Sequence, residues 1–244
     1  MNLLKHAWKS AFTFSDQELK NFFFIVVFSG FILSFRRWGT DSFDSSAGLI
    51  NFIVFSLIFL IIYSLFIAAQ KFLAGYLGYD CKYSLWHFGP AIGIFLTFVS
   101  YGWIPFLYLG SIDLKENMRL RLGTYRPYVH IKDLMWVGIA GPLMLLLLLI
   151  IILQPLYFLT QSTLVLDFIM SISWILIFTS LPLPKTNGIN VLLYSRKVWS
   201  FYFFFSLLTF FLVRSMNIYA YVIVAVIALL LVWVVKKFIT DKYL

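Results

Sequence analysis

The chain has 244 residues, of which 62% are hydrophobic, 20% aromatic and only 12% charged. A soluble domain is about 45–50% apolar and about 25% charged. The composition therefore excludes a water-soluble enzyme, a disordered chain and a nucleic-acid binder, because too few charged side chains remain to cover a surface in water. The single cysteine, Cys81, excludes an internal disulfide and a multi-cysteine metal cluster.

Six apolar stretches predict membrane-spanning helices, because a bilayer core about 30 Å thick takes about 20 apolar residues in a helix. The first stretch ends in Arg36 and Arg37 without a small-residue cleavage site, which predicts a retained helix rather than a signal peptide. The six stretches cover residues 21–35, 49–75, 134–153, 164–181, 198–213 and 218–235.

A seventh apolar stretch, Ala91–Gly110, has a different pattern. It is interrupted by Gly93, Gly102, Pro105 and Gly110. Glycine and proline at that density argue against one straight spanning helix. We therefore expect a re-entrant or interfacial segment, whose irregular backbone must be covered by protein or line a wet cavity.

The net charge of +9 is unevenly distributed along the predicted topology. With a cytoplasmic amino terminus and six crossings, sixteen of the nineteen Lys and Arg residues lie in the cytoplasm. Only Arg36, Arg37 and Arg214 lie on the other side. A seventh crossing would remove this asymmetry. The positive-inside rule therefore predicts six crossings in the cell membrane with both termini cytoplasmic, and the charge needs no nucleic acid to explain it.

The longest polar stretch, Ser111–Asp133, lies on the predicted cytoplasmic side. Apolar and basic residues alternate over Met118–Leu122, which predicts a short strand. Anionic lipid headgroups are the favoured partner of this basic loop, because each nearby Lys or Arg adds about 1 kcal/mol of attraction to them. The predicted fold class is an all-α integral membrane domain over residues 1–244, with six helices, one interrupted segment and a small strand-containing cytoplasmic loop.

Three short segments carry a family resemblance, in sequence order between about residues 49 and 193. The first is FIAAQKFLAGYLG at 66–78, and the second is AGPL at 140–143, which includes Gly141 and Pro142. The third is FTSLPLPKTNG at 178–188, which includes Pro182, Pro184 and Gly188. Together they resemble the signatures of the site-2 protease family of intramembrane zinc metalloproteases, in particular its six-helix archaeal-like branch.

The resemblance implies a family fold without the family's reaction. It places Phe66 and Gln70 at the two histidines of the HExxH motif, Ile67 at its glutamate and Asn187 at the zinc-binding aspartate. Phenylalanine and isoleucine offer neither a zinc ligand nor a general base, and a neutral amide is a poor zinc ligand. The implied protein is an inactive pseudoprotease without a metal cofactor. It would bind or scaffold a transmembrane partner, as a subunit of a membrane complex. We expect Phe66, Gln70 and Asn187 to converge on one small site.

Two functions of other classes stay open. An active metalloprotease would need an unusual metal site built from Asp80, Cys81, His87 or His130, since zinc requires three or four ligands. A small-solute or ion transporter would use Asp167, which lies three residues into the fourth apolar stretch. An acid inside a membrane segment is a functional hypothesis by default, although a place near the outer end lets it reach the interface.

Overall fold

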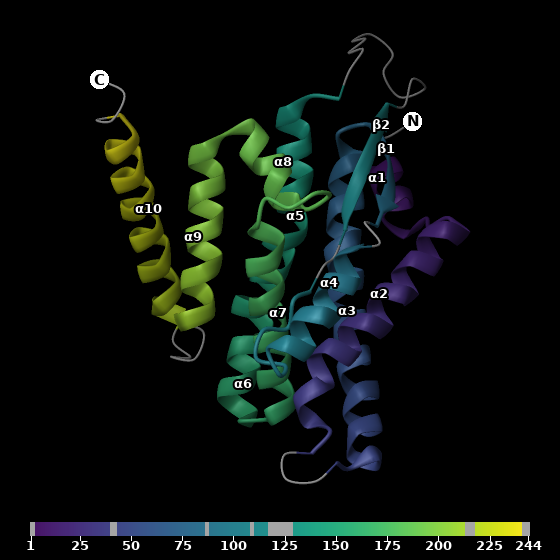
Figure 1. Ribbon diagram of the computed structural model, residues 1–244. Helices are drawn as coiled ribbons and strands as arrows, with labels where there is room; N and C mark the ends of the chain where they lie inside the picture. The colour runs from purple at the N-terminus through teal and green to yellow at the C-terminus, as the bar shows by residue number, and fades with distance from the viewer. Residues whose placement is uncertain are drawn as a thin grey trace.

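The computed structural model describes residues 3–39, 43–85, 88–107, 110–116, 129–212 and 218–240. These residues form a mainly helical molecule with one small sheet (Figure 1). Its helices are α1 (Leu3–Phe12), α2 (Asp16–Ser34), α3 (Ser45–Tyr76), α4 (Phe88–Val99), α5 (Ile131–Leu148), α6 (Gln154–Thr160), α7 (Thr163–Ser180), α8 (Asn187–Tyr194), α9 (Arg196–Leu212) and α10 (Ile218–Thr240).

Four helical segments among the described residues are long and apolar enough to cross a membrane. These are Asp16–Arg37, Ser45–Tyr76, Ile131–Thr160 and Thr163–Ser180. The molecule is thus all-α and has the helices of a membrane protein, which confirms the coarse fold class. The last two predicted stretches form α9 and α10, which pack against each other beside α7 (Figure 1).

The first two long helices begin four or five residues earlier than their apolar stretches. Ser15 caps α2, since its hydroxyl accepts from the Glu18 backbone while the Glu18 carboxylate accepts from the Ser15 N–H. Asp44 caps α3 by accepting from the backbone of Ser46 and Ala47. The first turns are polar and capped, so hydropathy alone did not include them.

The third predicted helix is longer than its apolar run and contains a local irregularity. α5 continues through one π-helical turn, η3 (Leu149–Leu153), into α6. Pro142 lies inside α5, where its ring nitrogen cannot donate the helical hydrogen bond that the Gly138 carbonyl would accept. The main chain of this helix therefore departs from regular α-helical hydrogen bonding at two places, Pro142 and the π-helical turn η3.

The sheet has two antiparallel strands, β1 (Tyr79–Ser84) and β2 (Ser111–Glu116). The strand expected at 118–122 lies outside the described residues, and the sequence pattern did not predict β1. Ser84 pairs with Ser111, so the chain between them leaves the sheet and returns to it. α4 is 12 residues long, about 18 Å at 1.5 Å per residue, too short to cross a 30 Å core.

The returning chain after α4 is irregular, and it is exposed at Tyr101, Trp103 and Ile104 but buried over its last residues before position 108. Pro105, Phe106 and Leu107 are buried, and the Phe106 ring meets Phe178 of α7 edge-on at 4.9 Å. Gly93 allows the close approach, because a Cβ there would lie 2.6 Å from the Phe106 carbonyl oxygen. The segment over 91–107 is therefore a short helix followed by irregular chain, and its re-entrant or interfacial placement in a membrane stays a prediction.

The hydrophobic core lies where α2, α3, α5 and α7 meet, and β1, β2 and the returning chain close one side of it. α3 is central and contributes several of the largest fully buried side chains. Its neighbours on either side are α2 and α5, and α1 packs on its last turns. These contacts place the two motif-bearing helices α3 and α5 side by side.

Candidate functional site

Phe66 of α3 packs directly on Gly141 of α5. A Cβ at position 141 would lie 2.7 Å from two carbons of the Phe66 ring, closer than real Cβ contacts come. Phe66 and its neighbour Ile67 are each 1% exposed and belong to the main core. The position that resembles the first zinc-binding histidine is therefore occupied by a ring seated on a glycine.

Asn187 begins α8, and a tight turn sets its position. The Thr186 hydroxyl donates to the Leu181 carbonyl and accepts from the Leu183 N–H at 3.1 Å. Gly188 lies so close to the end of α7 that a Cβ there would come within 2.6 Å of the Ser180 carbonyl carbon. This turn contains Pro182 and Pro184 and folds the start of α8 back against α5.

Phe66 and Asn187 contact the same face of α5. A Cβ on Gly138 would lie 3.5 Å from the Asn187 carbonyl oxygen and 3.7 Å from its Cβ. Gly138 and Gly141 are three residues apart, which places them on one helical face. The Phe66 side chain and the start of α8 at Asn187 therefore contact α5 within one helical turn of each other.

Gln70 approaches the same turn from α3. The two helices are antiparallel, because Tyr79 donates to the Asp133 carboxylate near one end while Phe66 meets Gly141 further along. Gln70 lies one turn from Phe66 toward the Tyr79 end, which brings it level with Gly138. Gln70 and Asn187 therefore approach one turn of α5 from two neighbouring elements.

Both amides are buried with an unused donor. Gln70 is 1% exposed and Asn187 is 2% exposed. In the described part of the chain, neither Gln70 Nε2 nor Asn187 Nδ2 has a hydrogen-bond partner. An unpaired buried donor costs about 1–3 kcal/mol, so this site carries unmet hydrogen-bonding capacity.

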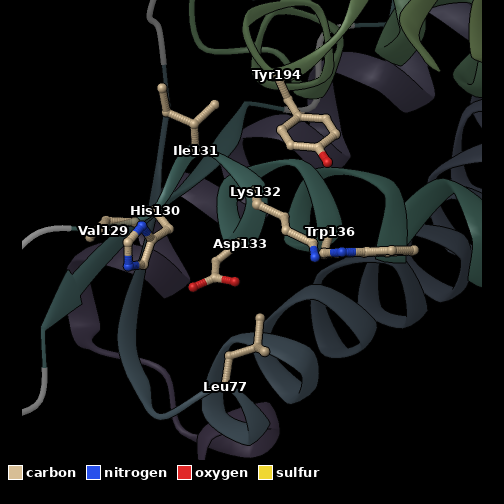
Figure 2. A pocket seen from close by; sticks show the side chains of 8 residues that line it. All are labelled: Leu77, Val129, His130, Ile131, Lys132, Asp133, Trp136 and Tyr194. Carbon is tan, nitrogen blue, oxygen red and sulfur yellow. The ribbon is translucent and has the colours of Figure 1, made fainter. Parts of the chain in front are cut away.

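An open pocket of about 960 Å³ is built from the ends of the same elements, and none of Phe66, Gln70 and Asn187 is among its lining residues. Its walls are the end of α3, the first two turns of α5 and the end of α8. Figure 2 shows Tyr194 and Leu77 on opposite sides of the first turn of α5, with Lys132 and Trp136 between them. Trp136 and Tyr194 are exposed, so the pocket combines aromatic surface with charged groups.

The residues considered for an unusual metal site do not come together in the described ranges. No group of three His, Cys, Asp or Glu side chains able to hold a metal ion occurs there. Asp80 lies 3.6 Å from His6, and Cys81 lies 3.4 Å from the Ser10 hydroxyl. His130 lines the pocket, and His87 lies outside the described residues. Burial raises the pKa of the Cys81 thiol, which favours its neutral form over a metal-binding thiolate.

Asp167 pairs with Arg37, a partner that sequence reasoning missed. Arg37 Nη2 lies 2.6 Å from Asp167 Oδ1 and joins the 3-10 turn that follows α2 (Phe35–Arg37) to the first turns of α7. The Arg37 carbonyl also accepts from Asn51 of α3 at 3.1 Å. The acid therefore has a structural partner in the protein. The signal in the sequence was that the predicted topology leaves only three bases on the outer side, of which Arg37 is one.

Sequence reasoning also missed a buried ion pair between Glu18 and Lys71. Lys71 Nζ lies 2.8 Å from the Glu18 carboxylate and donates to the Thr13 carbonyl at 2.8 Å. Glu18 also accepts from the Tyr83 N–H at 2.7 Å. The pair joins α2, α3, β1 and the turn after α1. Lys71 directly follows Gln70 in α3 and holds the neighbouring face of that helix in place.

Comparison with known protein families, with curated proteins and with solved structures finds no match for this chain.

Proposed function

We propose that this protein is a proteolytically inactive membrane protein of site-2-protease-like design that holds a transmembrane partner. The partner would bind where α3, α5 and α8 meet, and the protein would act as a scaffold or complex subunit rather than as an enzyme. The observation that carries the proposal is the pair of buried amide nitrogens, Gln70 Nε2 and Asn187 Nδ2, which have no hydrogen-bond acceptor among the described residues.

The chemistry of this site suits main-chain recognition. Both amide donors are buried, so they can donate to carbonyl oxygens of an extended or locally unwound partner segment once the packing between α3, α5 and α8 opens. Pro142 frees the Gly138 carbonyl from its helical hydrogen bond, which supplies an acceptor on the same turn. Such hydrogen bonds between membrane segments contribute about 0.6–2 kcal/mol each. Hence the site would supply specificity, and the apolar helix surfaces would supply most of the contact.

The proposed setting is the cell membrane with six crossings and both termini in the cytoplasm. α9 has 17 residues and α10 has 23, so each approaches or exceeds the length that a bilayer core requires. With this orientation the open pocket faces the cytoplasmic interface, where exposed Trp and Tyr side chains such as Trp136 and Tyr194 are typical. Anionic lipid headgroups remain the proposed partner of the basic loop, whose residues 117–128 lie outside the described ranges.

Photo-crosslinking in intact membranes tests the partner proposal. A photoreactive amino acid replaces Trp136 or Tyr194 at the pocket, and Leu57 on the lipid-facing side of α3 serves as the control position. We expect a discrete adduct from the pocket positions whose crosslinked peptide maps to a transmembrane segment. The control position should give lipid adducts. Lipid adducts at all three positions would contradict the proposal.

A second set of variants connects that adduct to the buried amides. Gln70→Leu and Asn187→Leu remove the donors while keeping similar volume. We expect each to reduce the pocket adduct about threefold or more, as the loss of a hydrogen bond of about 0.6–2 kcal/mol implies. Gln161→Leu, an exposed amide at the far end of α6, is the matched control and should leave the adduct unchanged. Equal yields from all three variants would remove the amides from the binding site.

A further inference from the structure

The amino-terminal helix α1 carries an exposed apolar stripe. Leu4, Trp8 and Phe12 are 52%, 59% and 69% exposed. They are spaced four residues apart, which aligns them along one side of a ten-residue helix. The Trp8 ring stacks on Phe12 at 6.0 Å and meets Phe72 of α3 edge-on at 5.4 Å. The stripe is therefore an ordered surface that faces outward from the protein.

The opposite side of α1 is fixed to α3. Ala7 and Ala11 are buried, and a Cβ on Gly75 would lie 2.9 Å from the Ala7 Cα. His6 Nδ1 lies 3.2 Å from the Gly75 carbonyl oxygen, to which it donates. Lys71 holds the turn after α1 through the Thr13 carbonyl. The rotation of α1 about its axis is therefore set by close contacts, and the stripe is exposed as a consequence.

Two lysines lie along one edge of the apolar stripe. Lys5 and Lys9 are exposed, and each lies about 100° around the helix from the stripe residue that precedes it. An apolar stripe with a tryptophan, bordered by lysines, is the pattern of a helix that lies in the membrane surface. The lysines complement the negative charge of lipid headgroups, and the stripe matches the acyl region just beneath them.

The stripe contacts α3 through Trp8 and Phe72, and α2 and α3 both carry exposed apolar side chains. Phe72 lies near the end of α3, and Leu19 and Phe23 are exposed on α2, both of which are candidate spans. α3 is 32 residues long, about 48 Å, so its end turns extend past a 30 Å core into the interface. α1 packs on the carboxyl-terminal end of α3, beside the small sheet (Figure 1).

We propose that α1 is an interfacial helix whose partner is the anionic bilayer surface. Leu4, Trp8 and Phe12 enter the boundary between headgroups and acyl chains, while Lys5 and Lys9 contact headgroup phosphates. The inference rests on the membrane placement of α2 and α3 in the proposed function and does not depend on the transmembrane partner. α1 would thereby fix the depth of α3, and with it the depth of Gln70.

Collision measurements on the full-length chain test this placement. Nitroxide labels are attached at Leu4→Cys and Phe12→Cys in a Cys81→Ser background, in nanodiscs of phosphatidylcholine and phosphatidylserine. Leu57→Cys provides the lipid reference and Asp113→Cys, on β2, the aqueous reference. We expect the labels at positions 4 and 12 to collide frequently with oxygen and rarely with a water-soluble nickel complex, as the label at position 57 does. Nickel collisions as frequent as at 113 would overturn the proposal. So would an immobilised label that meets neither reagent, because protein would then cover the stripe.

Charge reversal tests the role of the headgroups separately. With the label at position 12, the double variant Lys5→Glu/Lys9→Glu should raise nickel collisions about twofold or more in discs containing phosphatidylserine. In discs of phosphatidylcholine alone we expect little change. Lys197→Glu, at an exposed position of α9 outside the basic loop, is the control and should have no effect in either disc. Nickel collision rates that do not change on charge reversal would overturn the claim that Lys5 and Lys9 contact anionic headgroups. Crosslinking at Trp136 is an independent readout, so failure here is distinguishable from failure of the partner proposal.

Discussion

At the scale of single residues, Glu18 and Lys71 link four parts of the fold. Their side chains are 7% and 1% exposed, and Lys71 also lies 4.0 Å above the Phe14 ring. A buried ion pair adds little net stability compared with an apolar pair, but removing one partner leaves an uncompensated charge. Through its contacts with the Thr13 carbonyl and the Tyr83 N–H, this pair fixes the positions of the turn after α1 and of β1 relative to α2 and α3.

Lys71→Met should therefore lower the free energy of unfolding by about 3–5 kcal/mol, because it leaves the Glu18 carboxylate buried without its cation. Denaturant unfolding in detergent micelles measures the loss. The double variant Glu18→Gln/Lys71→Met should recover part of it, since it removes both charges. Lys20→Met, at an exposed position of α2, is the control and should change stability by less than about 0.5 kcal/mol. A Lys71→Met loss no larger than that would contradict the structural role.

Two glycines of α5 give opposite predictions at the candidate site. Gly141→Ala places a methyl group 2.7 Å from a fully buried Phe66 ring, so we expect a loss of about 1–3 kcal/mol from overpacking. Gly138→Ala meets only ordinary contacts at 3.5 Å and beyond, and it should be neutral or stabilise by up to about 1 kcal/mol through helix propensity.

Thermal unfolding of both variants beside the parent protein checks this contrast. Phe66→Leu combined with Gly141→Ala should cost less than the sum of the two single changes, because the smaller side chain makes room for the methyl group. Equal effects of the two alanines would mean that Phe66 does not sit on Gly141, and the resemblance-based placement of the site would lose its main support.

At the scale of elements, helix ends and irregular segments decide what the sequence pattern could reveal. Apolar runs located the long helices, because burial in lipid or core requires them. The polar first turns at Asp16 and Ser45 were missed, because caps rather than hydropathy define them. β1 was missed because its partner strand begins 27 residues after it ends, and a non-local pairing leaves no local periodicity.

The cap of α3 makes a pH-dependent prediction. Hydrogen bonds from Ser46 and Ala47 lower the pKa of the Asp44 carboxyl in the folded protein. A lowered pKa means that the carboxylate stabilises the fold above the unfolded pKa of about 3.9, and that this contribution is lost as the pH falls through the folded value. Asp44→Ala should therefore lower Tm near neutral pH, and the difference from the parent should shrink below about pH 4.

Melting curves between neutral and acidic pH measure this effect. Asp44→Asn keeps a side-chain oxygen acceptor but cannot ionise, so its Tm should lie between those of the parent and Asp44→Ala at neutral pH. Its difference from Asp44→Ala should not vary with pH. A parent-to-alanine difference that grows in acid would have the wrong sign for a carboxylate cap.

At the scale of the whole molecule, the sequence pointed to residues of the candidate site but not to the ion pairs that hold the helices together around it. The family resemblance predicted that Phe66, Gln70 and Asn187 converge, and the structure shows Phe66 beside Gly141 and Asn187 beside Gly138 on one face of α5. The Arg37–Asp167 pair spans 130 residues, and the Glu18–Lys71 pair joins helices across the core. Such pairings depend on how helices rotate against each other, which hydrophobic periodicity fixes only to within a face. The interruption of the helix after Val99 was predictable because glycine and proline act locally.

The two strands also constrain the topology. Lys82 pairs with Asp113, so the chain between them begins and ends on one side of any membrane that the bundle crosses. An even number of crossings follows for that segment, and its 12-residue helix excludes a pair of full spans. With the amino terminus inside, residues 113 and 197 then face the cytoplasm, while residues 45 and 163 face outward. A seventh crossing at α4 would exchange the sides of 113, 163 and 197 and leave 45 outside.

Single-cysteine labelling in intact cells distinguishes these topologies. In the Cys81→Ser background, a membrane-impermeant maleimide should label Ser45→Cys and Thr163→Cys. Asp113→Cys and Lys197→Cys should react only after permeabilisation, which also shows that each thiol is accessible. Labelling of 45, 113 and 197 but not 163 would establish a seventh crossing and contradict the strand pairing. Labelling of 113 and 197 alone would place both termini outside. That result would reverse the charge asymmetry that six crossings explain, with sixteen of nineteen basic residues on the outer face.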